Sequence, residues 1–225
     1  MQIIESSNWG VRSARLTFRH PITDQTVTLF PMIHVAEAAF YDRVFRDANA
    51  HDAVLIEGVD SPITKRVTRS YRWIGERLGL VVQPRHPRSG GAVVVHADLS
   101  GEAFEELWAG LPRWQRWLIA AVAPVMGLHR RWFVTREMIA AQLGMDDARS
   151  RKELLEWSPE TALLHRVILD ARDARLLEVL AEQLAVHRSI AVVYGAAHMR
   201  AVIRELTQRR GFVSAEGDWM LVFAL

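Results

Sequence analysis

Short apolar runs alternate along this chain with longer segments in which apolar residues recur every three or four positions. Runs of the first kind are typical of buried strands, and the second pattern is typical of amphipathic helices. The pattern predicts strands at residues 11–19, 26–33, 53–56, 92–95, 189–194, 212–214 and 219–223. It predicts helices at residues 36–50, 62–78, 100–108, most of 111–143, 158 to about 187, and 198–209.

The order strand–helix–strand occurs at both ends of the chain, and a long helical segment separates the two ends. That order predicts an α/β fold with mixed sheets and flanking helices. The helical segment, about residues 107–156, is interpreted as a Trp-rich insertion that breaks at Pro124 and Gly127. No stretch has the composition of an interdomain linker, so we expect one domain over residues 1–225.

The charge balance and the cysteine content exclude several classes of function. Lys and Arg number 28 and Asp and Glu 26, so the net charge of +2 argues against nucleic acid as the main partner. The absence of cysteine excludes disulfides, thiolate catalysis and cysteine-based zinc sites. Residues 1–15 lack the apolar stretch of a secretory signal, and the longest apolar run, 117–128, is shorter than the roughly 20 residues that span a bilayer. We therefore expect a cytoplasmic protein.

Two histidines stand at similar places in the pattern. His34 follows the apolar run of residues 28–33, His198 follows that of residues 191–194, and each stands at the start of a predicted helix. In open α/β folds, ligands bind beyond the carboxyl ends of the strands, so both imidazoles are expected at one rim. Gly195 suits a place where the backbone turns sharply or passes close to another group. The alternative is that each histidine caps its helix or packs at a turn.

Two carboxylates also follow predicted strands. Glu57 ends the buried run of residues 54–56, where a charge is costly unless it is paired or bound to a cation. Asp98 holds the comparable place after residues 93–95. A salt bridge to an arginine is the alternative for Glu57, and an N-terminal helix cap is the alternative for Asp98.

Arg172 and Asp173 lie in the long predicted helix that precedes the last part of the chain. Arg172 is three residues after Leu169 and four before Leu176, which puts it on or beside the apolar face, where a charge needs a partner. Such an arginine is expected to face a polar cavity or a buried carboxylate. The alternative for both residues is an exposed ladder of ion pairs along the helix.

Five segments of the chain resemble the TraB/PrgY/GumN family, whose animal relatives are the TIKI proteases. They are PMIHVAEAAFYDRV at 31–44, VLIEGV at 54–59, VVHADLS at 94–100, LDARDARLLEVL at 169–180 and VVYGAAHMRAVIRELTQRRGF at 192–212. The resemblance implies a fold related to the erythromycin esterases and the ChaN-like proteins. It implies that the motif residues are His34, Glu57, Arg172 with Asp173, and Gly195 with His198. Pro31 stands where the family's first motif has glycine, although the histidine of that motif is kept.

The resemblance implies a metal-dependent hydrolase that cleaves a peptide or another amide. His34, His198 and Glu57 would hold a divalent Zn, Mn, Co or Fe ion and leave one position open for water. Arg172 would stabilise the developing oxyanion or bind a substrate carboxylate. Two further carboxylates would orient a ligand histidine or act as a base, namely Asp98 and Asp173.

Two other functions fit the same residues. In a metal-free esterase, His34 would be the general base that activates water, and Glu57 would raise its basicity. A non-catalytic protein would instead bind a peptide or a tetrapyrrole. Metal content, and hydrolysis measured before and after chelation, separate the metal-dependent function from the other two. The expected partner in every case is a peptide or a small molecule.

The Trp-rich part of the insertion, residues 107–133, has several interpretations. Its tryptophans are Trp108, Trp114, Trp117 and Trp132. It would act as a lid, as a dimer surface, or as an interfacial membrane helix over residues 113–131, where arginines flank the apolar positions. The large area of tryptophan favours instead a pair of helices buried against the sheet. A homo-oligomer is a further expectation, because half of the residues are hydrophobic.

Overall fold

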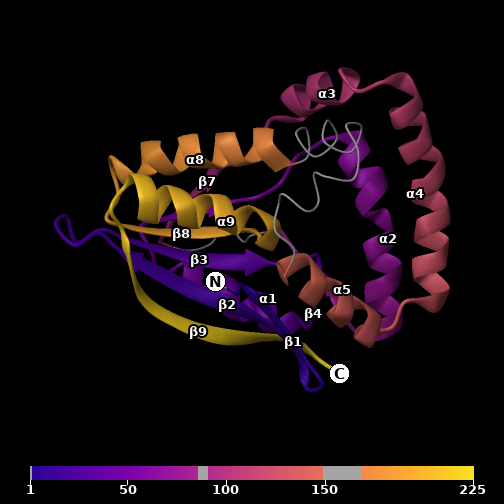
Figure 1. The fold of residues 1–225 in the computed structure, drawn as a ribbon, viewed down its shortest axis with the longest axis horizontal. Helices are drawn as coiled ribbons and strands as arrows, with labels where there is room; N and C mark the ends of the chain where they lie inside the picture. The colour runs from indigo at the N-terminus through magenta and orange to yellow at the C-terminus, as the bar shows by residue number, and fades with distance from the viewer. Residues whose placement is uncertain (1, 86–90, 149–168) are drawn as a thin grey trace.

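The computed structural model describes residues 2–85, 91–148 and 169–225. They form a mixed α/β fold in which helices flank a seven-stranded mixed sheet (Figure 1). The strands of this sheet are β1 (Ile4–Ser7), β2 (Gly10–Arg19), β3 (Thr26–Met32), β5 (Ala53–Ile56), β7 (Val93–His96), β8 (Ser189–Gly195) and β9 (Val213–Ala224). A separate two-stranded antiparallel sheet consists of β4 (Val35–Ala36) and β6 (Val81–Val82). The predicted α/β class with mixed sheets and flanking helices is confirmed.

The strand order of the large sheet is β1-β2-β3-β8-β5-β7, and β9 pairs with β2. The four strands β3, β8, β5 and β7 run parallel. Val192 of β8 lies in register with Leu29 of β3 on one side and with Leu55 of β5 on the other. Because these strands share one direction, the residues that follow their carboxyl ends are delivered to the same edge of the sheet.

Helices cover both faces of the sheet. The described helices are α1 (Ala38–Ala48), α2 (Pro62–Leu78), α3 (Gly101–Ala109), α4 (Arg113–Phe133), α5 (Arg136–Ala148), α8 (Ala171–Leu184) and α9 (Ala196–Arg204), which continues into the π-helical turn η2 (Glu205–Arg209). In Figure 1, α8 and α9 lie in front of the sheet with α1 behind it, and α2 to α5 gather on the right. Within the described ranges, no helix has the length and apolar content needed to cross a membrane.

The central strands show why the sequence pattern there is apolar without alternation. All residues from Val27 to Met32 and from Ile190 to Tyr194 are buried. A strand whose two faces are both covered by helices buries consecutive side chains, whereas a strand with one wet face alternates. Leu176 and Leu180 of α8 are fully buried in the same core, as are Phe40 and Tyr41 of α1.

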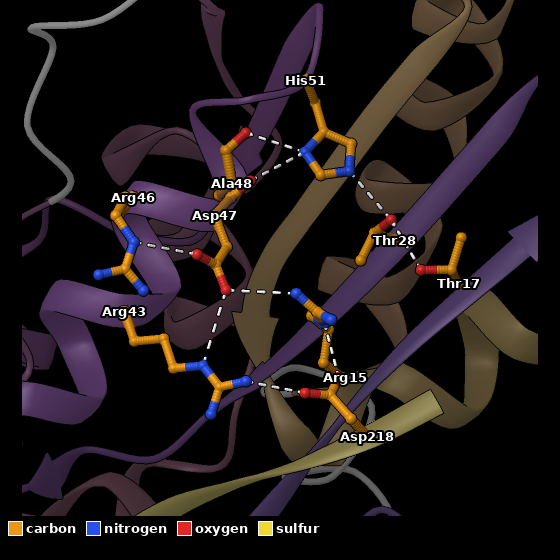
Figure 2. A network of polar contacts seen from close by, with 9 residues as sticks. All are labelled: Arg15, Thr17, Thr28, Arg43, Arg46, Asp47, Ala48, His51 and Asp218. Carbon is orange, nitrogen blue, oxygen red and sulfur yellow. Dashed lines mark hydrogen bonds and ion pairs between the residues drawn. The ribbon is translucent and has the colours of Figure 1, made fainter. Parts of the chain in front are cut away.

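A ring of ion pairs ties α1 to the antiparallel part of the sheet (Figure 2). Asp218 of β9 accepts from Nε of Arg15 at 2.6 Å and from Nη2 of Arg43 at 2.8 Å. Asp47 of α1 contacts the same two guanidinium groups at 3.3 and 3.7 Å. The two arginines and two carboxylates neutralise one another beside a cavity of about 360 Å³, lined by Arg15, Thr17, Glu216, Gly217 and Asp218.

His51 closes the other side of this network in Figure 2. Its Nδ1 lies 3.2 and 3.1 Å from the carbonyl oxygens of Asp47 and Ala48, so Nδ1 carries the proton. Its Nε2 lies 3.0 Å from Oγ1 of Thr28, which can therefore donate to it. Burial of the ring lowers the pKa of His51 and outweighs the raising effect of the hydrogen bonds to the carbonyl groups of Ala48 and Asp47.

Three sequence predictions about secondary structure are wrong. α4 runs without interruption through Pro124 and Gly127, because the loss of one backbone hydrogen bond need not end a helix that packs along a neighbour, here α2. The two closing strands are one, β9, whose long pairing with β2 carries the chain through Gly217. The strand predicted as buried at residues 92–95 is the edge strand β7, so Val93 is half exposed.

The interpretation of the Trp-rich segment as helices buried against the sheet is also wrong. α4 packs along α2 at the outer edge of the molecule, on the right of Figure 1. Trp114, Trp117 and Trp132 are exposed, while Trp108 of α3 stacks on Phe104 in a small separate cluster. The helix start predicted at Ser158 lies outside the described residues.

Candidate functional site

The carboxyl ends of three parallel strands bring three predicted site residues together. Glu57 directly follows β5, Asp98 lies two residues beyond β7, and Gly195 is the last residue of β8. Because the three strands run parallel, these residues lie at the same edge of the sheet. The fourth parallel strand, β3, delivers His34 to the same edge.

Arg172, in the first turn of α8, joins the two carboxylates. Its Nε donates to Asp98 at 2.9 Å, and its Nη2 donates to Asp98 at 2.7 Å and to Glu57 at 2.6 Å. The Asp98 side chain is fully buried, whereas those of Glu57 and Arg172 keep 11% and 13% exposure and so form the solvent-facing part of the cluster. The expectation that Arg172 meets a buried carboxylate is confirmed, and so is the salt bridge expected for Glu57.

The local electrostatics keep Asp98 and Arg172 charged. Burial by itself would raise the pKa of Asp98, but Arg172 and the N–H groups of Gly58 and Leu99 hold that pKa below its ordinary value. Burial also works against the charge on Arg172, yet Asp98 and Glu57 raise the pKa of Arg172 above its ordinary value. The alternative that Asp98 caps a helix is wrong, because Ser100 holds that position on α3.

Two glycines allow the carboxylates to approach the backbone. Gly195 donates its N–H to Oε2 of Glu57 at 2.5 Å, and a Cβ at Gly195 would stand only 3.0 Å from that oxygen. Gly58 has a φ of 152°, which side-chain-bearing residues rarely adopt, and in this conformation its N–H reaches Asp98 at 3.0 Å. The close approach predicted for Gly195 is therefore confirmed, and its partner is Glu57.

His198 of α9 forms the second half of the cluster. Its Nδ1 lies 2.6 Å from Oδ1 of Asp173, the residue after Arg172, and both side chains are buried. Since a carboxylate only accepts, Nδ1 carries the proton, and in the neutral ring Nε2 then carries the lone pair. The expected exposed ladder of ion pairs is therefore wrong for Asp173, which faces inward.

Tyr194 connects the two halves and was not predicted from the sequence. Its ring lies edge-on to the imidazole of His198 with centroids 4.9 Å apart, and the guanidinium carbon of Arg172 lies 5.6 Å from its centroid. Burial, and next the charge of Asp98, raise the pKa of the Tyr194 hydroxyl, so it stays protonated. The only sequence signal was an aromatic residue at the last apolar position of a strand, which is equally typical of a core residue.

His34 has a different environment from His198. It is exposed, and its ring lies 4.8 Å from the ring of Tyr71 on α2. Its carbonyl oxygen accepts from the N–H of Gln83 at 2.9 Å, which holds the backbone in place. The structure therefore seats His34 against α2.

The arrangement does not fit the metal site expected from His34, Glu57 and His198. Among residues 2–85, 91–148 and 169–225, no three His, Asp or Glu side chains are grouped so that they could hold one ion. Both oxygens of Glu57 already accept hydrogen bonds, one from Arg172 and one from Gly195. A guanidinium supplies the positive charge at the carboxylates that a divalent cation would otherwise supply.

Chemically, the cluster combines an imidazole held through Nδ1 and an oriented cation with the carboxylates that hold both. Comparisons with family models, with curated proteins and with solved structures find no match to this chain.

Proposed function

We propose that this protein is a hydrolase of carboxylic esters or amides that works without a metal ion and uses His198 as its general base. The observation that carries the proposal is the 2.6 Å hydrogen bond between His198 and Asp173, beside an arginine held by two carboxylates. A buried carboxylate that keeps an imidazole in one tautomer and one orientation supports general-base catalysis. Relative to the metal-free esterase expected from the sequence, the base moves from His34 to His198.

The proton transfers follow from the tautomer of His198. Nε2 removes a proton from a water molecule while the water oxygen forms a bond to the carbonyl carbon of the substrate. The electron pair of the carbonyl π bond moves to the oxygen, which becomes an oxyanion. When the tetrahedral intermediate collapses, the bond to the leaving group breaks and that group receives the proton from Nε2. The products are a carboxylic acid and an alcohol or amine.

Arg172 is the residue that stabilises the oxyanion. The contacts with Tyr194 put its guanidinium carbon within about 10.5 Å of the imidazole centroid of His198. Nη1 takes part in none of the three bonds to Glu57 and Asp98, so its N–H groups are the donors for substrate. Because Glu57 and Asp98 fix the guanidinium before substrate binds, the guanidinium needs little reorganisation during the reaction.

The resemblance to the TraB/PrgY/GumN family supports the same residues, and a fold related to the erythromycin esterases and ChaN-like proteins is part of the proposal. Peptides and other amides are the substrate class that this resemblance favours. The metal-dependent hydrolase is the competing candidate, since a carboxylate also commonly holds a metal-bound histidine in this way.

The test is a hydrolysis screen of the purified protein with chromogenic esters and fluorogenic peptides, before and after treatment with EDTA. The proposal expects activity that survives EDTA and is lost in His198→Ala, while His34→Ala keeps most of it. Activity that EDTA removes and a divalent ion restores would overturn the metal-free mechanism in favour of the metal-dependent one. Activity retained in His198→Ala would overturn the assignment of the base.

A further inference from the structure

One side of α4 carries an apolar stripe that faces away from the rest of the protein. The stripe begins at Trp114, Trp117, Leu118 and Val122, a spacing that puts these side chains on one face of a helix. Such a face is normally buried, but all four side chains are exposed, Trp117 by 78%. At the end of the helix two more apolar residues are exposed, Trp132 and Phe133.

The opposite side of α4 is the side that packs against the rest of the protein. Gln115 is 6% exposed and Arg116 is partly buried, and α4 packs along α2. Figure 1 shows α4 as the outermost helix on its side of the molecule, with α2 between it and the sheet. The helix is therefore fixed by its polar side and presents its apolar side outward, which is the reverse of an ordinary surface helix.

The charges of α2 and α4 are almost all positive, whereas α3, which precedes α4, contains the three glutamates Glu102, Glu105 and Glu106. α4 contains four arginines and no acidic residue, and α2 contains five Lys or Arg and the single acid Glu76. Together these two helices hold nine of the 28 basic residues of the chain but one of its 26 acidic residues. The small net charge of the whole chain thus conceals two strongly basic helices.

We propose that α4 docks this protein on a membrane surface that carries anionic phospholipids. A helix with Trp, Leu and Phe along one side and basic residues beside them binds the boundary between headgroups and acyl chains. The tryptophans enter that boundary, where an apolar ring with one N–H donor is favoured. Arg113, which is exposed at the start of α4, is attracted to the lipid phosphates and carboxylates.

A second copy of the chain fits this face less well than a lipid surface does. In a twofold contact through α4, the same helix would stand on both sides, so arginine-rich segments without acidic partners would face each other. An anionic membrane supplies the opposite charge together with an apolar layer, and the stripe needs both.

The experiment measures binding of the whole protein to sedimented vesicles of phosphatidylcholine alone and of an equal mixture with phosphatidylserine. The proposal expects binding to the mixed vesicles, a blue shift of tryptophan fluorescence, and weakening at high salt. The double variant Trp114→Ser, Trp117→Ser should bind about tenfold more weakly or worse, since about 1.4 kcal/mol corresponds to that factor. Its fold should persist, because both side chains are exposed.

Trp9→Ser is the matched control, because Trp9 is 88% exposed and lies in the turn between β1 and β2, away from α4. Binding of this variant should equal that of the wild type. Equal binding to the two kinds of vesicle, or a double variant that binds as well as the control, overturns the proposal. The proposal is also overturned if the protein does not bind vesicles but dimerises in analytical ultracentrifugation and the double variant does not. In that case a second copy of the chain covers the stripe.

Discussion

Arg172 contacts Asp98 side-on, with Nε and Nη2 of the guanidinium donating to the two carboxylate oxygens at 2.9 and 2.7 Å. A paired contact of this kind fixes the plane of the guanidinium as well as its position. The two bonds to Asp98 link α8 to the loop after β7. The third bond, to Glu57, links α8 to the end of β5. The orientation of Arg172 is thus set by two strands that are separated from it by more than 70 residues of sequence.

Replacing Arg172 with lysine should remove most of the turnover. An ammonium group cannot reproduce the planar fork, so the oxyanion loses an oriented donor and kcat should fall about 100-fold or more. The buried Asp98 also loses one of its two bonds from Arg172, which should lower the free energy of unfolding by about 1–3 kcal/mol. Steady-state kinetics and urea unfolding measure the two effects. Wild-type turnover together with an unchanged melting temperature would show that Arg172 is only a helix charge.

Asp173→Asn should impair catalysis much more than folding. The amide can donate to Nδ1, which forces the proton of His198 onto Nε2 and removes the lone pair that accepts the proton from water. A loss of about 10³–10⁴ in kcat is expected for a histidine held in the wrong tautomer. Glu178→Gln is the control, since Glu178 is an exposed carboxylate on the same helix that pairs with Arg175. Similar kinetics for the two variants would contradict the proposed role of Asp173.

Asp98→Asn should destabilise the protein in a way that depends on pH. The pKa of Asp98 is lowered in the folded state, so its contribution is complete above the unfolded value of about 3.9 and disappears as the pH falls through the folded pKa. At neutral pH the loss of one partner of a buried ion pair should cost about 3 kcal/mol. Denaturant unfolding of both proteins over a range of pH measures this difference. It should shrink in strong acid, and a difference independent of pH would contradict the assignment.

His51 should make the protein less stable in mild acid. Its pKa is lowered by burial, so the neutral imidazole is the form that the folded state favours. Its contribution is therefore present above the unfolded value of about 6.5 and is lost as the pH falls through the folded pKa. In His51→Gln the stability lost across this pH interval should be smaller than in the wild type. The ring of ion pairs in Figure 2 should remain in the variant, because none of its bonds involves the imidazole.

The secondary structure could largely be predicted from the sequence, because the signals are local. The strand at residues 53–56 and the helix at 62–78 have the predicted bounds, since apolar clustering, an N-cap serine and a final glycine all act within one element. The charge on Glu57 at the end of a buried strand was enough to predict a cationic partner. The sequence placed Glu57, Asp98 and Gly195 at strand ends, but their meeting depends on the parallel pairing of these strands, which only the structure shows.

The choice among partners was decided only by the tertiary structure. Nothing local distinguishes Arg172 from the other arginines as the partner of Glu57, because that pair forms across 115 residues of sequence. In the same way, the pairing of Asp173 with His198 depends on how α8 packs beside α9. The apolar stripe of α4 shows most directly what the sequence pattern leaves undecided. Periodicity reveals that one side of a helix is apolar, but whether that side is buried depends on which neighbour the helix packs against, and here α2 takes the other side.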